Sequence, residues 1–220
     1  MAAQQLSARI LSERTEIEMW KIRSGRFSES EWEKFVLTMQ ELSSIPLYID
    51  DTGGISIAQI AARSRRLKRE KNIGAIMIDY LQLVEPSRRA ENRVQEITEI
   101  TKGLKALAKE LNLPIVALSQ LSRGVDSRDD KRPVLSDLRE SGSIEQDADV
   151  VMFVYREEYY LNTREPEPGT AEHTKWAEKL DRATNKAEVL VEKHRHGATN
   201  RIELFFDARF TRFSNLASDA

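Results

Sequence analysis

The sequence predicts an α/β fold: a mostly parallel twisted sheet flanked by helices, with antiparallel strands at the C-terminal end. Two observations carry this prediction. In the middle of the chain, short apolar runs alternate with longer amphipathic stretches, which is the pattern of strands joined by helical crossovers. Near the end, three strand-like runs follow one another with only tight turns between them, which favours antiparallel pairing.

The composition is that of a globular protein. The chain has 220 residues, of which 40% are hydrophobic and 32% are charged, enough for a substantial core. No apolar run approaches the roughly 20 residues of a membrane span, and the first residues do not have the order of a signal peptide. The absence of cysteine excludes disulfides and fits a cytoplasmic location. The net charge of −2 leaves any binding of nucleic acid to local basic groups.

The predicted elements follow the chain in order. Residues 1–44 repeat apolar side chains at spacings of three and four, which predicts two or three short amphipathic helices. Residues 45–156 are expected to form the parallel core, with Ser56 as a plausible N-cap of its first helix. Within this core we expect strands at 45–51, 74–84, 114–121 and 148–156, and helices at 55–72 and 91–112.

Three further segments surround or follow the core strands. Residues 122–143 carry charges of both signs, two glycines and a proline with little periodicity, which predicts a long loop. Residues 157–184 contain "EPEPG" and are expected to be a mobile insertion. Residues 185–216 should form the antiparallel strands, with a turn centred on Gly197. No second domain is evident from the sequence.

The stretch "GAIMIDYLQLV", residues 74–84, places Asp79 inside a strand that we expect to be buried on both faces. Burying a carboxylate without a partner costs several kcal/mol. Because ligands bind at the carboxyl ends of parallel strands, Asp79 is a candidate Walker B aspartate, which orients the water shell of Mg²⁺ on a nucleoside triphosphate. The alternative is a carboxylate that accepts hydrogen bonds from loop amides. Gln120 ends the neighbouring strand and could contact a γ-phosphate.

Several segments together resemble a known family. They are "IDDTGGISIAQI", "GAIMIDYLQLV", "DLRESGSIEQDAD" and the "KHRHG" turn. In this order they are similar to the C-terminal motor domain of the DnaB-type replicative helicases, and "DLRESGSIEQDAD" is highly specific to that family. The resemblance covers nearly the whole chain. It implies a RecA-like P-loop NTPase core that uses ATP and Mg²⁺, acts as a homo-hexamer on single-stranded DNA, and meets a primase and a helicase loader.

The same resemblance implies roles for individual residues. It makes Asp79 the Walker B aspartate, acting on Mg²⁺ through water, and Gln120 the sensor of the γ-phosphate. It places Arg139, Glu140 and Gly142 against the backbone of single-stranded DNA. An arginine can pair with phosphate and a glycine allows close approach of its N–H, whereas Glu140 should brace the loop or use its main-chain N–H. The alternative is a solvated surface loop.

Two cations near the turn at Gly197 match another family feature. Lys193 and Arg195 correspond to the pair that reaches the nucleotide of the neighbouring subunit, where an arginine finger raises the rate by roughly 10³ to 10⁵. The alternatives are two solvated cations, or a metal site at His194 and His196, which has little support without cysteines. The basic run at residues 63–71 is expected to be a solvated or subunit-contacting helix face and not a DNA-binding patch.

The sequence departs from the family pattern in one respect. It contains no G-x-x-x-x-G-K-[ST] motif, whose amides and lysine cradle the phosphates. The opening "MAAQQLSARIL" resembles the helix after the family's "SLEM" strand. We therefore expect the P-loop and the catalytic glutamate upstream of Met1, and the isolated chain to be inactive. The alternatives are a non-catalytic RecA-like binding module or another RecA-like ATPase.

Overall fold

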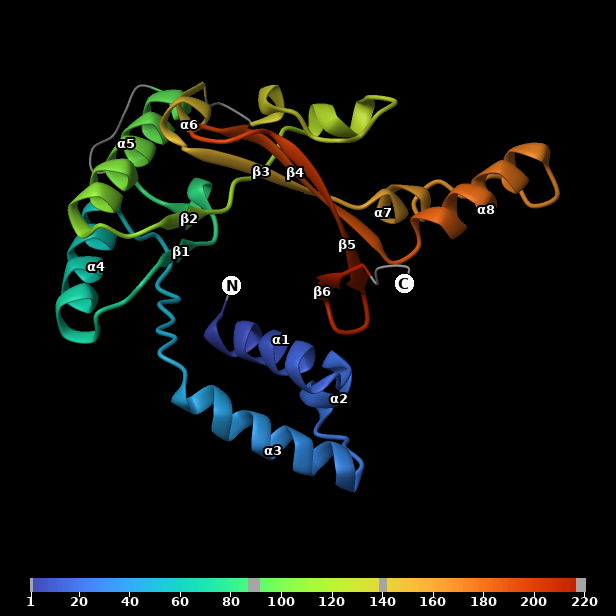
Figure 1. The fold of residues 1–220 in the computed structure, drawn as a ribbon, viewed down its shortest axis with the longest axis horizontal. Coiled ribbons are helices and arrows are strands. Elements are labelled where there is room, and N and C mark those ends of the chain that lie inside the picture. Colours follow the sequence, from blue (N-terminus) through green and yellow to red (C-terminus); the bar gives the residue numbers. More distant parts are fainter. Residues whose placement is uncertain (1, 87–91, 139–141, 217–220) are drawn as a thin grey trace. The chain divides into compact units, whose positions relative to one another are not determined.

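A computed structural model of the chain describes residues 2–86, 92–138 and 142–216 (Figure 1). Helices accompany parallel and antiparallel strands, which confirms the predicted α/β class. The chain divides into two compact units. Unit 1 comprises Met1–Asp51, Val154–Leu190 and Asn200–Ala220, and unit 2 comprises Thr52–Phe153 and Val191–Thr199. Within the described ranges, no helix is both long and apolar enough to cross a bilayer.

Unit 2 contains a parallel pair of short strands. β1 (Ile76–Ile78) pairs with β2 (Ile115–Ala117), with Met77 opposite Val116. A 3₁₀ turn, η1 (Leu81–Leu83), follows β1, because the chain bends so that the Leu81 N–H donates to the Leu118 carbonyl at 2.9 Å. Both strands are therefore shorter than the sequence predicts.

Helices α4 (Ile57–Lys71) and α5 (Arg93–Leu111) precede β1 and β2, respectively, and both confirm the predicted helices. Ser56 caps α4 in a reciprocal capping box with Gln59, which satisfies backbone N–H groups that have no partner within the helix. The Asn92 side chain caps α5 by accepting from the Gln95 N–H at 3.0 Å.

The core of unit 2 lies along α5. Ile97 and Ile100 have an exposed fraction of 0%, and Leu104 and Leu107 are also buried. A Cβ atom at Gly103 would lie 2.6 Å from Cγ1 of Ile57 on α4. Only glycine therefore allows the two helices their close approach at this point.

The β1–β2 pair is covered on one face only. The Met77 side chain is 76% exposed, and Val116 and Leu118 are exposed at 42% and 50%. Asp79 is also exposed. The prediction that residues 74–84 are buried on both faces is therefore wrong for this structure, and Asp79 does not incur the expected cost of burial.

The segment between β2 and the next strand is more regular than expected. It contains the 3₁₀ turns η2 (Arg123–Ser127) and η3 (Leu135–Asp137) and the short helix α6 (Gly142–Asp147). The strand β3 (Val150–Tyr155) follows, with alternate side chains buried and exposed. Short local elements thus replace the long irregular loop in the part that the structure describes.

Unit 1 opens with three helices, α1 (Ala3–Thr15), α2 (Met19–Ser24) and α3 (Glu29–Ser44), where two or three were predicted. The predicted strand at residues 45–51 is wrong, because these residues have no regular secondary structure. Their large apolar side chains stay exposed, for example Leu47 at 54%. A strand needs hydrogen bonds to a neighbouring strand, and no strand in the described part of the chain pairs with this segment.

A second sheet has the strand order β3-β4-β5-β6, with β4 (Lys186–His194), β5 (Asn200–Asp207) and β6 (Arg212–Asn215). β5 and β6 are antiparallel, as predicted. A Cβ atom at Gly197, in the turn after β4, would lie 2.3 Å from Nδ1 of His194, so any other residue there would require the exposed His194 ring to move.

The segment for which the composition predicts a mobile insertion contains two helices, α7 (Glu157–Leu161) and α8 (Ala171–Ala183). The indole N–H of Trp176 on α8 donates to the Leu161 carbonyl at 2.9 Å. The Tyr160 ring stacks on Tyr155 with centroids 5.8 Å apart. Aromatic packing thus gives this polar segment a regular structure.

We predict that Ile100→Ala destabilises the protein by about 2–5 kcal/mol, because a fully buried side chain leaves a cavity in the core of unit 2. The matched control is Val94→Ala, also on α5 but 48% exposed, which should change stability by less than about 0.5 kcal/mol. Urea unfolding of both variants measures the difference. Equal effects would show that α5 does not bury the face described here.

Candidate functional site

The two strand-end residues singled out by the sequence lie at the same edge of the β1–β2 pair. Asp79 follows β1 directly, and Gln120 lies three residues beyond β2. The Leu118 N–H donates to the Ile78 carbonyl at 2.9 Å, which extends the pairing to this edge. Both Asp79 and Gln120 are exposed, so a ligand at this edge could reach both side chains.

A third residue, Gln82, connects the two strand ends. Its Oε1 atom accepts from the Gln120 N–H at 3.2 Å, and its Nε2 atom donates to Ser119 Oγ at 3.1 Å. Nη2 of Arg93 on α5 donates to the Gln82 carbonyl at 2.6 Å. No role was predicted for Gln82 from the sequence. The only sequence feature that pointed to this residue is its position three residues after Asp79.

Lys193 and Arg195 meet at the C-terminal end of α6. The Lys193 ammonium donates to the Glu145 carbonyl. Arg195 Nη2 donates to the Gln146 carbonyl at 3.4 Å, and its Nη1 lies 2.9 Å from Asp149 Oδ1. The structure therefore places the two predicted cations side by side against the end of the same short helix, α6.

The Asp149 carboxylate pairs with a second cation in addition to Arg195. The ammonium group of Lys105 on α5 donates to Asp149 Oδ2. This hydrogen bond, together with the charges of Lys105 and Arg195, holds the pKa of the Asp149 carboxyl below its ordinary value. Sequence reasoning assigned no role to Lys105 or Asp149, although Asp149 is the last residue of the "DLRESGSIEQDAD" motif.

The predicted DNA-binding residues are described only in part. Arg139 and Glu140 lie outside the described residues. Gly142 is exposed and is the first residue of α6. It therefore begins the same helix whose other end holds Lys193 and Arg195.

The described part of the loop, residues 123–138, is held by internal contacts. The Arg128 guanidinium forms a fork with the buried Asp137 carboxylate, at 3.1 and 2.7 Å. The buried Lys131 ammonium donates to the carbonyls of Asp126 and Arg128. These contacts agree with a braced surface loop for this described part.

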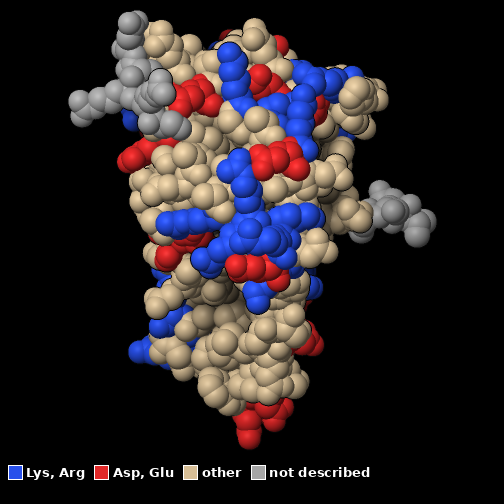
Figure 2. Space-filling view, turned by 90° about the vertical axis from the view of Figure 1, so that its left-hand side faces the viewer, with Lys and Arg blue, Asp and Glu red and all other residues tan. Residues whose placement is uncertain are grey.

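A band of cations covers the exposed side of α4, as Figure 2 shows. Arg65 is paired with Glu110 through two hydrogen bonds of 2.7 and 2.8 Å, and Arg66 lies 3.5 Å from Glu70. Arg69 and Lys71 are also exposed. The two carboxylates neutralise part of the band, in keeping with the solvated face that the sequence predicts.

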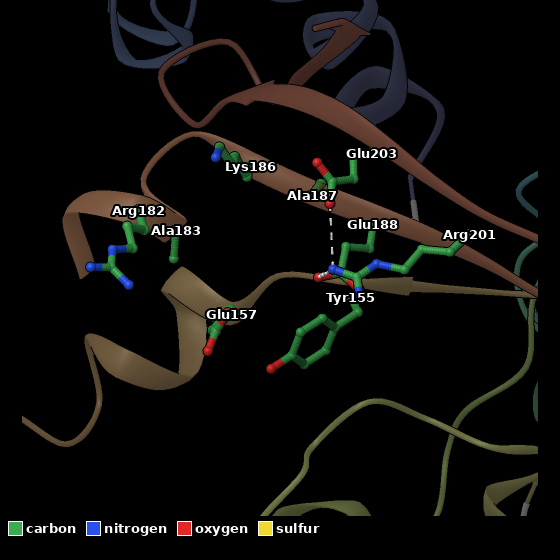
Figure 3. A pocket seen from close by; sticks show the side chains of 9 residues that line it. All are labelled: Tyr155, Glu157, Arg182, Ala183, Lys186, Ala187, Glu188, Arg201 and Glu203. Atoms are coloured by element: carbon green, nitrogen blue, oxygen red, sulfur yellow. Dashed lines mark hydrogen bonds and ion pairs between the residues drawn. The ribbon is translucent and has the colours of Figure 1, made fainter. Parts of the chain in front are cut away.

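A pocket of about 150 Å³ lies in unit 1, and none of the predicted site residues lines it (Figure 3). Arg201 crosses it and pairs with Glu188 at 2.7 Å and Glu203 at 3.5 Å. Its charged lining residues balance one another: Arg182, Lys186 and Arg201 against Glu157, Glu188 and Glu203. The pocket therefore has no net positive charge to attract a phosphate group, and we do not propose it as a nucleotide-binding site.

The parallel strands, their helical crossovers and the polar residues at adjacent strand ends define an α/β core of the RecA-like class. The model of the DnaB-like helicase C-terminal domain matches residues 1–215. The chain therefore belongs to the DnaB-like helicase C-terminal domain family.

Named relatives and solved structures agree with this assignment. The chain is 51% identical to the replicative DNA helicase DnaB of Rickettsia typhi and 44% identical to the replicative DNA helicase DnaC of Bacillus subtilis. Each alignment covers 98% of this chain but 44% of the relative. The chain thus spans less than half the length of these relatives.

Two solved structures have the same fold. One is a DnaB-like replicative helicase described with its interactions with primase, at 38% identity and a TM-score of 0.84. The other is an ATPase domain, at 37% identity and a TM-score of 0.84. Both comparisons cover 98% of this chain, which spans 50% of the first structure and 72% of the second.

We predict that Gln82→Leu speeds hydrogen exchange of the Gln120 amide by about two- to tenfold, because a hydrogen bond that contributes about 0.5–1.5 kcal/mol is lost. Gln82→Glu is the matched control, since its carboxylate can still accept from that amide. Amide exchange followed by NMR measures both. If the two variants exchange equally fast, Gln82 does not hold the end of β2.

Proposed function

We propose that this chain is the C-terminal part of the motor domain of a replicative DNA helicase, which couples ATP hydrolysis to movement along single-stranded DNA and to duplex unwinding. The observation that carries the proposal is the placement of Asp79 and Gln120 at adjacent strand ends, with Gln82 bound to the Gln120 N–H, in a chain that matches the family over residues 1–215. The names of the relatives support it.

In this proposal the strand ends handle the nucleotide. The exposed carboxylate of Asp79 suits Mg²⁺, a hard cation that prefers oxygen ligands and retains several of its waters. Bound between phosphates, Mg²⁺ would neutralise charge that develops on the transferred group. Asp79 would orient the ion through water. The Gln120 side chain would donate to a γ-phosphate oxygen, while Gln82 fixes its main chain.

We propose that a segment not contained in this sequence supplies the phosphate cradle, because this sequence has no G-x-x-x-x-G-K-[ST] motif. The open apolar face of β1 and β2, with Met77, Val116 and Leu118 exposed, leaves a surface for such a segment, since parallel sheets are normally covered on both faces. The chain also spans only 72% of the matching ATPase domain. We therefore expect the isolated chain to hydrolyse ATP at no more than a trace rate.

The proposed partners follow from the family and from the roles of the cations. Lys193 and Arg195 would act on the nucleotide of a neighbouring subunit, which requires an assembly such as a homo-hexamer. Single-stranded DNA would lie against the loop that contains Arg139, Glu140 and Gly142. A primase is supported by the solved relative described with it. We also propose that the protein binds a helicase loader and that it is located in the cytoplasm.

We predict that Arg195→Ala in the full-length protein abolishes ATP hydrolysis, a loss of roughly 10³-fold or more, and leaves ATP binding largely intact. The reason is that the guanidinium would stabilise the transition state and not the bound substrate. Steady-state hydrolysis and nucleotide titration measure the two quantities.

Mixed rings test whether Arg195 acts across the subunit boundary. Arg195→Ala subunits keep their own nucleotide site, and Asp79→Asn subunits keep an intact Arg195. Mixing the two should restore activity at interfaces that pair the intact parts. No recovery in mixed rings would contradict action in trans.

We predict that Arg139→Ala in the full-length protein weakens binding of single-stranded DNA about equally for all sequences, because phosphate contacts carry no base information. The slope of log affinity against log salt should flatten by roughly 0.7 for each subunit contact that is lost. Binding measured over a range of salt concentrations gives the slope.

Arg69→Ala on α4 is the matched control, since it removes the same charge from the exposed cation band. Its slope should equal that of the wild type. An unchanged slope for Arg139→Ala at normal stability would instead favour a braced surface loop, as the contacts of Arg128 and Lys131 show for its described part.

A further inference from the structure

Arg195 is held at several points by Gln146, near the end of α6, and by Asp149, which follows α6. Its main-chain N–H donates to the Asp149 carbonyl at 2.8 Å, and its Nη1 atom lies 2.9 Å from Asp149 Oδ1. Nη2 also donates to the Gln146 carbonyl at 3.4 Å. Both the backbone and the guanidinium of Arg195 are therefore tied to one short stretch of chain.

Asp149 is itself anchored from the other side. Lys105 on α5 donates to Oδ2, so the carboxylate bridges two cations, one through each oxygen. The neighbouring Asp147 accepts from Thr101 of α5 at 2.7 Å. Because α5 buries its apolar face in the core of unit 2, these contacts connect Arg195 to a well-packed helix.

The contacts leave part of the guanidinium available. An arginine has five N–H donors in a planar fork, and the Arg195 side chain is 43% exposed. A carboxylate on one edge fixes the direction of the fork while another edge can meet an anion. This geometry suits a side chain that is oriented before its target arrives.

We propose that Asp149 is a positioning residue, which fixes Arg195 so that its guanidinium is ready for the phosphates of the neighbouring subunit's nucleotide. This inference rests on the proposed function of Arg195 as a trans-acting cation. Asp149 then affects hydrolysis only through Arg195 and makes no contact with the nucleotide. A misplacement of a catalytic group by about 1 Å can lower the rate by up to roughly 10²-fold, whereas the loss of a weak surface ion pair changes the rate little. We expect the loss of the Asp149 carboxylate to lower the hydrolysis rate by an amount between these two limits.

The test is Asp149→Asn in the full-length protein. It keeps the shape of the side chain but removes the charge that holds Lys105 and Arg195. We expect kcat for ATP hydrolysis to fall about tenfold, with KM for ATP and the melting temperature nearly unchanged. Asp149→Glu should recover part of the rate, because it restores a carboxylate. Asp181→Asn, on the exposed side of α8, is the charge-matched control and should behave as the wild type.

Mixed rings separate positioning from a defect in the subunit's own nucleotide site. Asp149→Asn subunits mixed with Asp79→Asn subunits should regain activity, since the latter supply a well-placed Arg195. Asp149→Asn mixed with Arg195→Ala should show no such gain. If Asp149→Asn does not assemble, Lys105→Met tests the same anchor in the same mixtures, with the same recovery expected.

Three results would overturn the inference. An unchanged rate for Asp149→Asn, beside an inactive Arg195→Ala, would remove Asp149 alone and leave the proposed function standing. A higher rate would show that Asp149 holds Arg195 back. A full rate for Arg195→Ala would remove the trans-acting cation itself, and the inference with it.

Discussion

Unit 2 is organised around helix α5, whose apolar face is shielded from water along its length. Ile97 and Ile100 are fully buried on that face, and Leu104 and Leu107 continue it. Burial of this kind contributes roughly 1.5–3 kcal/mol for each large side chain. The close approach of α4 at Gly103 depends on the same packing. The short strands β1 and β2 alone, with three residues each, would provide little stability.

The polar side chains of α5 connect this packed helix to the candidate site. Arg93 holds the main chain of Gln82, which in turn holds the end of β2. About two and three turns further along, Thr101 and Lys105 hold the residues that end α6 and follow it. One buried helix therefore supports both groups of functional residues: the strand ends proposed for the nucleotide, and the cations proposed for its neighbour. Rigid support of this kind is what a site that depends on geometry requires.

The sequence by itself determined the features that depend on local interactions. The helices α4 and α5 could be predicted because their apolar periodicity and, for α4, the cap at Ser56 act within a few residues, whereas the cap of α5 at Asn92 was found only in the structure. The antiparallel pairing of β5 and β6 followed from a tight connection, which leaves the chain few alternatives. The family could also be identified, because the "DLRESGSIEQDAD" motif is local in the chain. The roles of Asp79, Gln120, Arg139, Glu140, Gly142, Lys193 and Arg195 stay predictions.

Tertiary structure alone decided the features that depend on partners distant in the chain. Residues 45–51 have the composition of a strand, but no neighbouring strand pairs with them in the described structure. Met77 lies in an apolar run, yet it is exposed because no described segment covers its face of the strand pair. The contacts of Gln82 with Gln120, and of Asp149 with Lys105 and Arg195, join residues about 38 to 46 positions apart. Periodicity and propensity describe a segment and its near neighbours, whereas such contacts arise only when the folded chain brings separate segments together.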